Sequence, residues 1–325
     1  MKITFVTIEG GVLRLFLGVD GGGTKTRVAV CDETGKILAK GEDGPSNPLV
    51  VSIDGMILSI KKALKNAGID KERFEVAVFG LAGAGFSKDN RKKLAEEIKR
   101  VVIARNILVY NDSFVALKGA LGSRKKGILV VAGTGSIVIG IDKNNQVFHV
   151  GGWGHLLGDE GSAYKLSVDS IKAVMKYWEG RGRKTKLEKK IREFFKVKDV
   201  DDIIKLFYQR SISKNIIASF SRVFMEVVEE GDPVAEDILL RNLEELSEGV
   251  IVLSKKLKTK YVSYTGGMFD SWIYKRNFQK ILKRYNINLK DKILPPVGGA
   301  LIIALNQMVN VDKKIIKNIK KIDKL

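Results

Sequence analysis

A pattern of three short strands joined by a glycine-rich turn and a polar turn occurs twice in this chain of 325 residues. The glycine-rich turns are Asp20–Thr24 and Gly133–Ser136. Glycine at such turns predicts an antiparallel meander in each copy, and the repetition indicates an internal duplication with little identity left. The expected strands are Leu15–Val19, Thr26–Asp32 and Ile37–Lys40, and then Gly127–Ala132, Ile137–Ile141 and Gln146–Val150.

Helical spacing of apolar residues follows each meander, and this mixture of strands and helices predicts the α/β class. The chain is long enough for two cores. We expect a first domain at 13–121, joined by a C-terminal helical segment at 297–325. We expect a second domain at 122–296, with a helical insertion after Asp159. Asp232-Pro233 predicts a helix start, because proline favours the first helical position.

Composition narrows the class of protein. A hydrophobic content of 45% with 29% charged residues is typical of a soluble globular chain. No apolar run is long enough for a membrane span, and the N-terminus lacks the pattern of a signal peptide. Cys31 is the only cysteine, which suits a reducing cytoplasm. Residues 1–11 precede the first strand, and we expect the natural chain to begin near Val12.

A net charge of +20 raises the question of nucleic-acid binding. The lysines alternate with acids along predicted helices instead of forming one basic stripe with aromatic residues between, so that partner is disfavoured. Abundant Lys, Ile and Glu with few Gln resemble the surface of a thermophile protein. The Lys-rich tail Lys313–Leu325 is interpreted as a solvated helix end.

The two glycine-rich turns match neither common nucleotide motif. The P-loop requires Gly-Lys-Ser/Thr, but Thr24 separates Gly23 from Lys25. The dinucleotide motif requires a third glycine where Thr26 and Val138 stand. What remains is a pair of hairpin turns with exposed N–H groups, which can form anion-binding concavities. Such turns could hold the phosphates of ATP, although a single turn of this kind would be an ordinary hairpin.

Two aspartates follow predicted strands. Asp20 adjoins the first glycine-rich turn, where phosphates would repel a carboxylate unless a cation such as Mg²⁺ lay nearby. Asp112 follows the strand Ile107–Tyr110 at the start of a predicted helix, where an N-cap is the ordinary role. Two histidines are too few for a metal site.

The chain resembles the N-acetylglucosamine kinase family. That family belongs to the BadF/BadG/BcrA/BcrD-type ATPase grouping, which includes dehydratase activators, within the actin–hexokinase–chaperone superfamily. The resemblance extends from about Leu15 to Gln307 and implies two duplicated ribonuclease-H-like (actin-like ATPase) domains with a cleft between them. The block from Trp153 to Tyr164 is its most specific part. The matching motifs are Asp20–Thr26, Ala132–Ser136, Gly151–His155, Gly158–Tyr164 and Thr265–Gly267.

The resemblance also implies roles for individual residues. Asp112 would be the general base and would contact the sugar, and Asp20 would bind Mg²⁺. The other sugar ligands would be Asn47, Trp153, Gly154 and Asp159. The ATP ligands would be Gly21, Gly22, Gly23, Thr24, Gly133, Thr134, Gly135, Ser136, Gly266 and Gly267. Pro296–Gly299 matches a family segment of unassigned role.

Three functions are compared on this basis. A sugar kinase, most simply one that converts N-acetylglucosamine to its 6-phosphate, uses every matching motif. A broad-specificity hexokinase and a glucosamine kinase stay open as alternatives. A dehydratase activator needs two thiolates from each subunit for a shared iron–sulfur cluster, and Cys31 alone cannot supply them. A non-catalytic sugar sensor would be expected to lack Asp112 or one loop. The oligomeric state is not determined, with a homodimer as one option.

Overall fold

The computed structural model describes residues 13–85, 87–209 and 212–324. The question of where the natural chain begins therefore lies outside the described residues. Internal contacts divide the chain into two compact units. The first contains the described residues up to Lys125 and from Asp291 onward, and the second contains Lys126–Lys290. Residues 122–125 and 291–296 thus group with the first unit, whereas the sequence-based boundaries assign them to the second domain.

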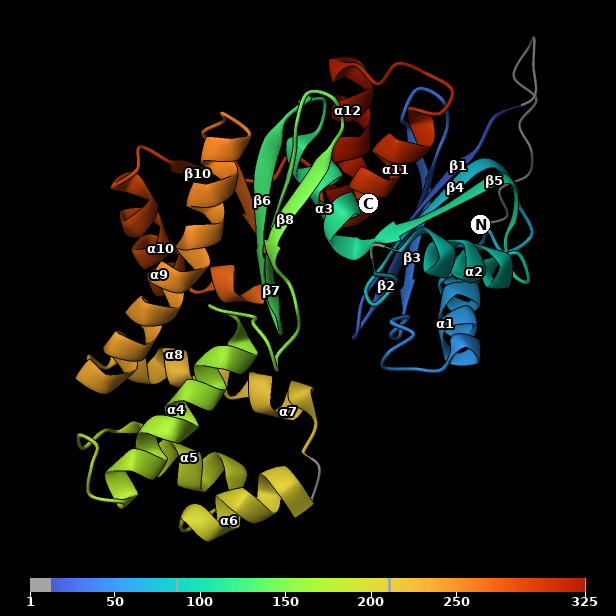
Figure 1. Ribbon diagram of the computed structural model, residues 1–325. Coiled ribbons are helices and arrows are strands. Elements are labelled where there is room, and N and C mark those ends of the chain that lie inside the picture. Colours follow the sequence, from blue (N-terminus) through green and yellow to red (C-terminus); the bar gives the residue numbers. More distant parts are fainter. Residues whose placement is uncertain (1–12, 86, 210–211, 325) are drawn as a thin grey trace. The chain divides into compact units, whose positions relative to one another are not determined.

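The first unit is built on a five-stranded sheet in the order β3-β2-β1-β4-β5 (Figure 1). The first three strands are antiparallel, while β4 and β5 run parallel to β1. The carboxyl ends of β1, β4 and β5 therefore meet at one edge of the sheet. The bounds are β1 (Phe16–Gly21), β2 (Thr26–Cys31), β3 (Ile37–Asp43), β4 (Arg73–Leu81) and β5 (Ile103–Asn111).

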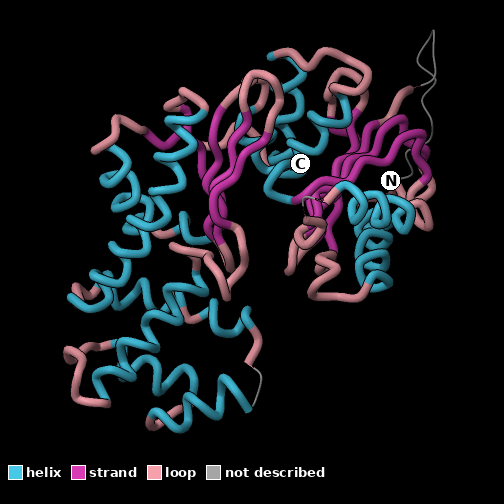
Figure 2. Tube along the Cα trace, viewed as in Figure 1, coloured by secondary structure: helices cyan, strands magenta, loops and turns pink. Residues whose placement is uncertain are grey.

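Helices cover both faces of this sheet (Figure 2). Alternate residues of β1 point to opposite sides, so Leu17 and Val19 join one core while Phe16 joins the other. Helices α1 (Ile53–Asn66) and α2 (Lys88–Ile98) pack on the first core. Helices α3 (Asp112–Leu121), α11 (Pro296–Leu305) and α12 (Lys313–Ile319) pack on the second, and η3 (Lys320–Lys324) follows.

The C-terminal segment is more buried than its lysines indicate. Ile316, Ile319 and Ile322 are buried in the second core of the first unit, so the prediction of a solvated helix end is wrong. The many lysines of this segment give it a polar composition, although these isoleucines recur every three residues. Nearby, Gly299 accounts for part of the unassigned Pro296–Gly299 segment, since a Cβ there would lie 1.9 Å from the carbonyl oxygen of Val115. Only glycine lets α11 lie so close to α3.

The second unit repeats the sheet of the first. Its order, β10-β9-β6-β7-β8, has the same plan: three antiparallel strands, with two more parallel to the strand that precedes the glycine-rich turn. This confirms the duplicated α/β fold predicted from the sequence. The strands are β6 (Gly127–Ala132), β7 (Ser136–Ile141), β8 (Val147–Gly151), β9 (Tyr261–Thr265) and β10 (Asn288–Lys290).

The remaining helices of this unit follow β8, apart from α10 and η2, which follow β9. Helix α9 packs on β6, β7 and β8, and α4, α5, α7 and α8 pack against one another. Asp232 caps α9, and Pro233 is its first residue, as predicted. The bounds are α4 (Ala163–Trp178), α5 (Leu187–Phe195), α6 (Val200–Ile204), η1 (Lys205–Gln209), α7 (Lys214–Ser219), α8 (Ser221–Glu229), α9 (Pro233–Lys256), η2 (Gly267–Asp270) and α10 (Trp272–Lys283). Within the described ranges, every helix is too short or too polar to cross a bilayer.

Candidate active site

The first glycine-rich turn begins where β1 ends. Gly21 pairs with Thr26 on β2 and with Leu81 on β4. A Cβ on Gly21 would lie 2.2 Å from Ser46 Oγ and 2.5 Å from Leu81 Cδ2. The turn can therefore pack against the loop before α1 only because this position is glycine.

The donors of this turn are only partly used. Gly22 N donates to Lys25 O at 2.8 Å, and Gly22 O accepts the backbone N–H of Asn47 at 3.2 Å. Among the residues that the structure describes, none accepts a hydrogen bond from the N–H groups of Gly23 and Thr24 or from the exposed Thr24 hydroxyl. These donors are placed as an anion-binding turn requires.

Asp20 and Asp112 lie close enough to affect each other. The Asp20 side chain is 17% exposed. Burial, and then the charge of Asp112, raise the pKa of Asp20 to about 7, although Arg27 and Lys292 oppose the shift. Burial also raises the pKa of Asp112, against a hydrogen bond from Ser113 N. Two repelling carboxylates in a partly desolvated place favour a bound cation.

A magnesium ion fits this pair of carboxylates. Mg²⁺ commonly uses one or two carboxylates and completes its octahedron with water and phosphate oxygens. Over the described part of the chain, no three His, Cys, Asp or Glu residues group as a metal site. An all-protein cage is therefore absent from that part, so Asp20 would hold such an ion together with oxygen ligands from outside the protein.

The N-cap of α3 is Asn111. Its Oδ1 accepts the N–H of Ser113 at 3.0 Å and the Ser113 hydroxyl at 2.6 Å. Asp112 is the first residue of the helix, and its Oδ1 also accepts the Ser113 N–H, at 2.8 Å. The interpretation of Asp112 as the helix cap is therefore wrong, because its neighbour holds that position.

Asn47 completes the group in the first unit. Its Oδ1 accepts the N–H of Leu49 at 2.9 Å, and a Cβ on Gly83 would lie 2.3 Å from that same oxygen. Gly83 follows the end of β4, which lies between β1 and β5. Because these three strands are parallel, the structure brings Asn47, Asp20 and Asp112 to the same edge of the sheet, beside the first glycine-rich turn.

The second glycine-rich turn has a similar pattern of donors. Gly133 N donates to Gly135 O at 2.9 Å. The first N–H groups of α4, from Ala163 and Tyr164, donate to the carbonyls of Gly133 and Thr134 at 2.9 and 3.4 Å. The carbonyls thus face the helix, while no described residue accepts the N–H groups of Thr134 and Gly135 or the Thr134 hydroxyl proton.

Asp159 supports this second turn from within the unit. Its Oδ1 accepts the N–H of Ser136 at 3.3 Å, and its Oδ2 accepts Lys214 Nζ at 2.9 Å. The Ser136 hydroxyl donates to the carbonyl of Glu160 at 2.7 Å. A Cβ on Gly135 would lie 2.7 Å from Asp159 Oδ2. Both Ser136 donors are therefore used internally, and Lys214 joins the site although no sequence motif points to it.

Gly266 lies against the strand that leads into the second turn. Thr265 pairs with Val131, and Gly266 has a φ of 106°, outside the usual range for L-residues. A Cβ there would lie 2.2 Å from Ala132 O. The predicted ATP ligands Gly266, the N-cap of η2, and Gly267, its first residue, thus lie next to the strand that leads into the second turn.

The Trp153 segment forms the turn after β8. Trp153 is 65% exposed, and its ring lies 5.0 Å from that of His149, centroid to centroid. Gly154 has a φ of 86°, and its carbonyl accepts the N–H of Gly158 at 2.9 Å. This turn leads directly to Asp159, so the predicted sugar ligands Trp153, Gly154 and Asp159 lie on one continuous segment of the chain. Among the described residues, no hydrogen bond or ring contact joins Trp153 to the second glycine-rich turn.

Comparison with known proteins identifies the family. The profile of the BadF/BadG/BcrA/BcrD ATPase family matches residues 17–304, a span that includes every predicted site residue. The chain belongs to the BadF/BadG/BcrA/BcrD ATPase family. Both glycine-rich turns and the segment that contains Asp159 lie inside the matched region.

Individual relatives cover nearly the whole chain. An N-acetylmuramic acid/N-acetylglucosamine kinase of Clostridium acetobutylicum is 33% identical, over 91% of this chain and 99% of the relative. An N-acetyl-D-glucosamine kinase of Dictyostelium discoideum is 27% identical, over 90% and 98%. A crystal structure of a protein from Chromobacterium violaceum, proposed to be an N-acetylglucosamine kinase, superposes with a TM-score of 0.72 at 23% identity, over 90% and 99%. That last likeness shows a shared fold.

Proposed function

We propose that this BadF/BadG/BcrA/BcrD ATPase family member is an ATP-dependent amino-sugar kinase that converts N-acetylglucosamine to its 6-phosphate. The observation that carries the proposal is the pair of duplicated turns, each with consecutive N–H groups and a threonine hydroxyl that donate to no described residue. Each of these turns is suited to donate to phosphate oxygens. The kinase relatives, which match almost end to end, support the choice of chemistry.

In this proposal Asp112 accepts the proton of the sugar 6-hydroxyl as its oxygen attacks the γ-phosphorus of ATP. The bond from that phosphorus to the bridging oxygen breaks, and ADP leaves with the electron pair. Burial raises the pKa of Asp112, which makes its carboxylate a stronger base than that of an exposed aspartate. A bound Mg²⁺ would offset the negative charge of the phosphate oxygens near Asp20.

The remaining residues hold the substrates. Thr24, Thr134 and their neighbouring glycines would donate to phosphate oxygens, and Gly266–Gly267 would lie along adenosine. Asn47 has its Oδ1 engaged with Leu49, so its Nδ2 is the group offered to a sugar hydroxyl. Asp159 would accept a further hydrogen bond from the sugar beside those of Ser136 and Lys214. Ser136 is left out of the proposed phosphate contacts, since its N–H and its hydroxyl already donate to Asp159 and Glu160.

Other parts of the proposal rest on composition. A single cysteine suits the cytoplasm, and the many Lys and Glu residues with few Gln suit a heat-adapted source.

A coupled assay of ADP release tests the proposal. N-acetylglucosamine, glucosamine, glucose and mannose would each be supplied with Mg·ATP, and the product identified by mass spectrometry. The proposal predicts the highest kcat/KM for N-acetylglucosamine with a single added phosphate at carbon 6. Preference for glucosamine, or equal use of all four sugars, would favour the glucosamine kinase or broad hexokinase alternative. Sugar-independent ATP hydrolysis would contradict a kinase altogether.

A further inference from the structure

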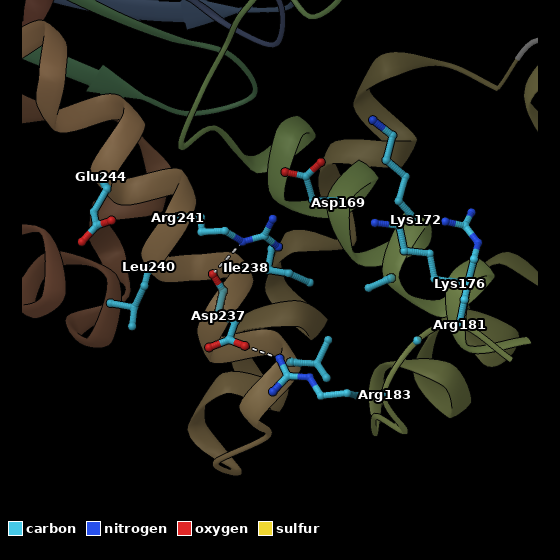
Figure 3. A pocket seen from close by; sticks show the side chains of 13 residues that line it. Asp169, Lys172, Lys176, Arg181, Arg183, Asp237, Ile238, Leu240, Arg241 and Glu244 are labelled. Carbon is cyan, nitrogen blue, oxygen red and sulfur yellow. Dashed lines mark hydrogen bonds and ion pairs between the residues drawn. The ribbon is translucent and has the colours of Figure 1, made fainter. Parts of the chain in front are cut away.

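A cavity lies within the second unit, and its lining includes none of the predicted catalytic, sugar or ATP ligands. It has a volume of about 760 Å³ and lies between the facing sides of α4 and α9 (Figure 3). The turn 181–183 also lines it. Ala173, Val234 and Ile238 supply apolar lining. None of the lining residues belongs to either glycine-rich turn, so we call this cavity the α4–α9 groove and treat it as a separate site.

The acidic side chains of the groove already have cationic partners. Asp169 pairs with Lys165 at 2.7 Å, and Glu244 pairs with Arg284 at 3.3 Å. The carboxylate of Asp237 pairs with Arg183. The negative charges that line the groove are therefore compensated within the protein.

Three of its cations lack such a partner. No described carboxylate lies within ion-pair distance of Lys172, Lys176 or Arg241. Lys172 and Lys176 are four residues apart on α4 and so share a face. Arg241 donates from Nε to Asp237 O at 3.3 Å, which leaves its terminal nitrogens for another acceptor. Figure 3 shows the Arg241 side chain extending from α9 toward α4.

We propose that the α4–α9 groove binds a small phosphate monoester whose uncharged body packs on the apolar lining. A phosphate dianion would match these cations, which lack a carboxylate partner, and the planar guanidinium of Arg241 can hold two of its oxygens. The volume falls in the range of small-molecule sites, roughly 300–1,000 Å³. This inference does not depend on the proposed kinase activity.

The groove is connected to the site segment by hydrogen bonds. Asp169, which lines the groove, accepts Asn242 Nδ2 at 3.0 Å. Asn242 Oδ1 in turn accepts the N–H of Gly161 at 3.3 Å. Gly161 follows Asp159 by two positions. An anion bound beside Asp169 would change the electrostatic environment of that carboxylate and, through Asn242, the hydrogen bond of Gly161, so the groove is placed to act as an effector site.

Calorimetric titration with phenyl phosphate tests the proposal, because this probe combines a phosphate monoester with an apolar body. Lys172→Ala/Lys176→Ala should weaken binding at least tenfold, and Arg241→Gln should weaken it independently. The matched control is Lys61→Ala/Lys65→Ala on α1, an exposed pair with the same spacing that should bind as the wild type does. Phenol should not bind.

Absence of binding to the wild type would overturn the proposal. Equal affinity in the wild type and in Lys172→Ala/Lys176→Ala would also overturn it, since the probe would then bind elsewhere, for example at the glycine-rich turns. Hydrogen exchange provides the second readout. Saturating phenyl phosphate should change the exchange rate of the Gly161 amide in the wild type and not in the double variant, and an unchanged rate would refute the effector role.

Discussion

Lys214 Nζ lies 2.9 Å from the carboxylate of Asp159, and the same carboxylate accepts the backbone N–H of Ser136. The Asp159 side chain is 4% exposed and that of Lys214 is 31% exposed. One nearly buried charge therefore joins the start of α7 to the second glycine-rich turn. The predicted sugar ligand Asp159 therefore has a second task, which is to hold the second glycine-rich turn in place.

Removing the lysine should destabilise the second unit. Lys214→Met would leave Asp159 buried without its counter-ion, at a cost of roughly 1–3 kcal/mol after allowance for the partial exposure of the lysine. The double variant Asp159→Asn/Lys214→Met should lose less, because no uncompensated charge remains. Urea unfolding of the wild type, both single variants and the double variant measures this coupling. Strict additivity would show that the pair does not interact.

The pKa of Asp20 predicts how stability depends on pH. Between its ordinary value of 3.8 and about 7, the folded protein retains a proton that the unfolded chain releases. This contribution therefore lowers stability as pH rises through that window, by up to about 4 kcal/mol above pH 7. Asp20→Asn should be more stable than the wild type at pH 8 and equal to it near pH 3.5, as measured by thermal unfolding. A pH-independent difference would refute the assignment.

Mg·ADP provides a matched test of the cation at Asp20. At pH 8, adding Mg²⁺ to ADP-bound protein should raise the melting temperature of the wild type more than that of Asp20→Asn. The physical reason is that the cation relieves the repulsion between Asp20 and Asp112. Equal shifts in both proteins would place the metal elsewhere.

Two glycines allow binding to be separated from folding. Gly133 has open space where a Cβ would be, whereas Gly266 has Ala132 O at 2.2 Å and a φ of 106°. Gly133→Ala should keep the melting temperature but raise the KM for ATP about tenfold, because the new methyl group would obstruct phosphate. Gly266→Ala should destabilise the fold by several kcal/mol. Normal ATP kinetics in Gly133→Ala would argue against phosphate binding at this turn.

The duplicated fold was predictable because glycine turns between apolar strands are local signals. Both meanders, the Asp232-Pro233 helix start and the class of the fold could be predicted in this way. The strand Asn288–Lys290 could not, since it has three residues and no buried position. The burial of Ile316 and Ile319 could not be predicted either, because lysines dominate the composition of the segment 313–325.

The candidate site was predictable where its residues adjoin a turn. Asp20, Asn47 and Asp112 reach one sheet edge because they follow, or pack on, the ends of parallel strands. The contact of Lys214 with Asp159 could not be predicted, since the two residues lie 55 positions apart and a lysine is common on any helix. The sequence allows Asp112 as the cap of α3, whereas Asn111 holds that position, because asparagine and aspartate are both good capping residues.

Proton transfer from the sugar to Asp112 is tested most directly by steady-state turnover with N-acetylglucosamine. Asp112→Asn preserves size and should lower kcat about 10²–10⁴-fold while ATP still binds. Asn111→Ala, the matched control, removes the helix cap and should cost about 0.5–2 kcal/mol of stability with kcat largely kept. A wild-type kcat in Asp112→Asn would contradict the account.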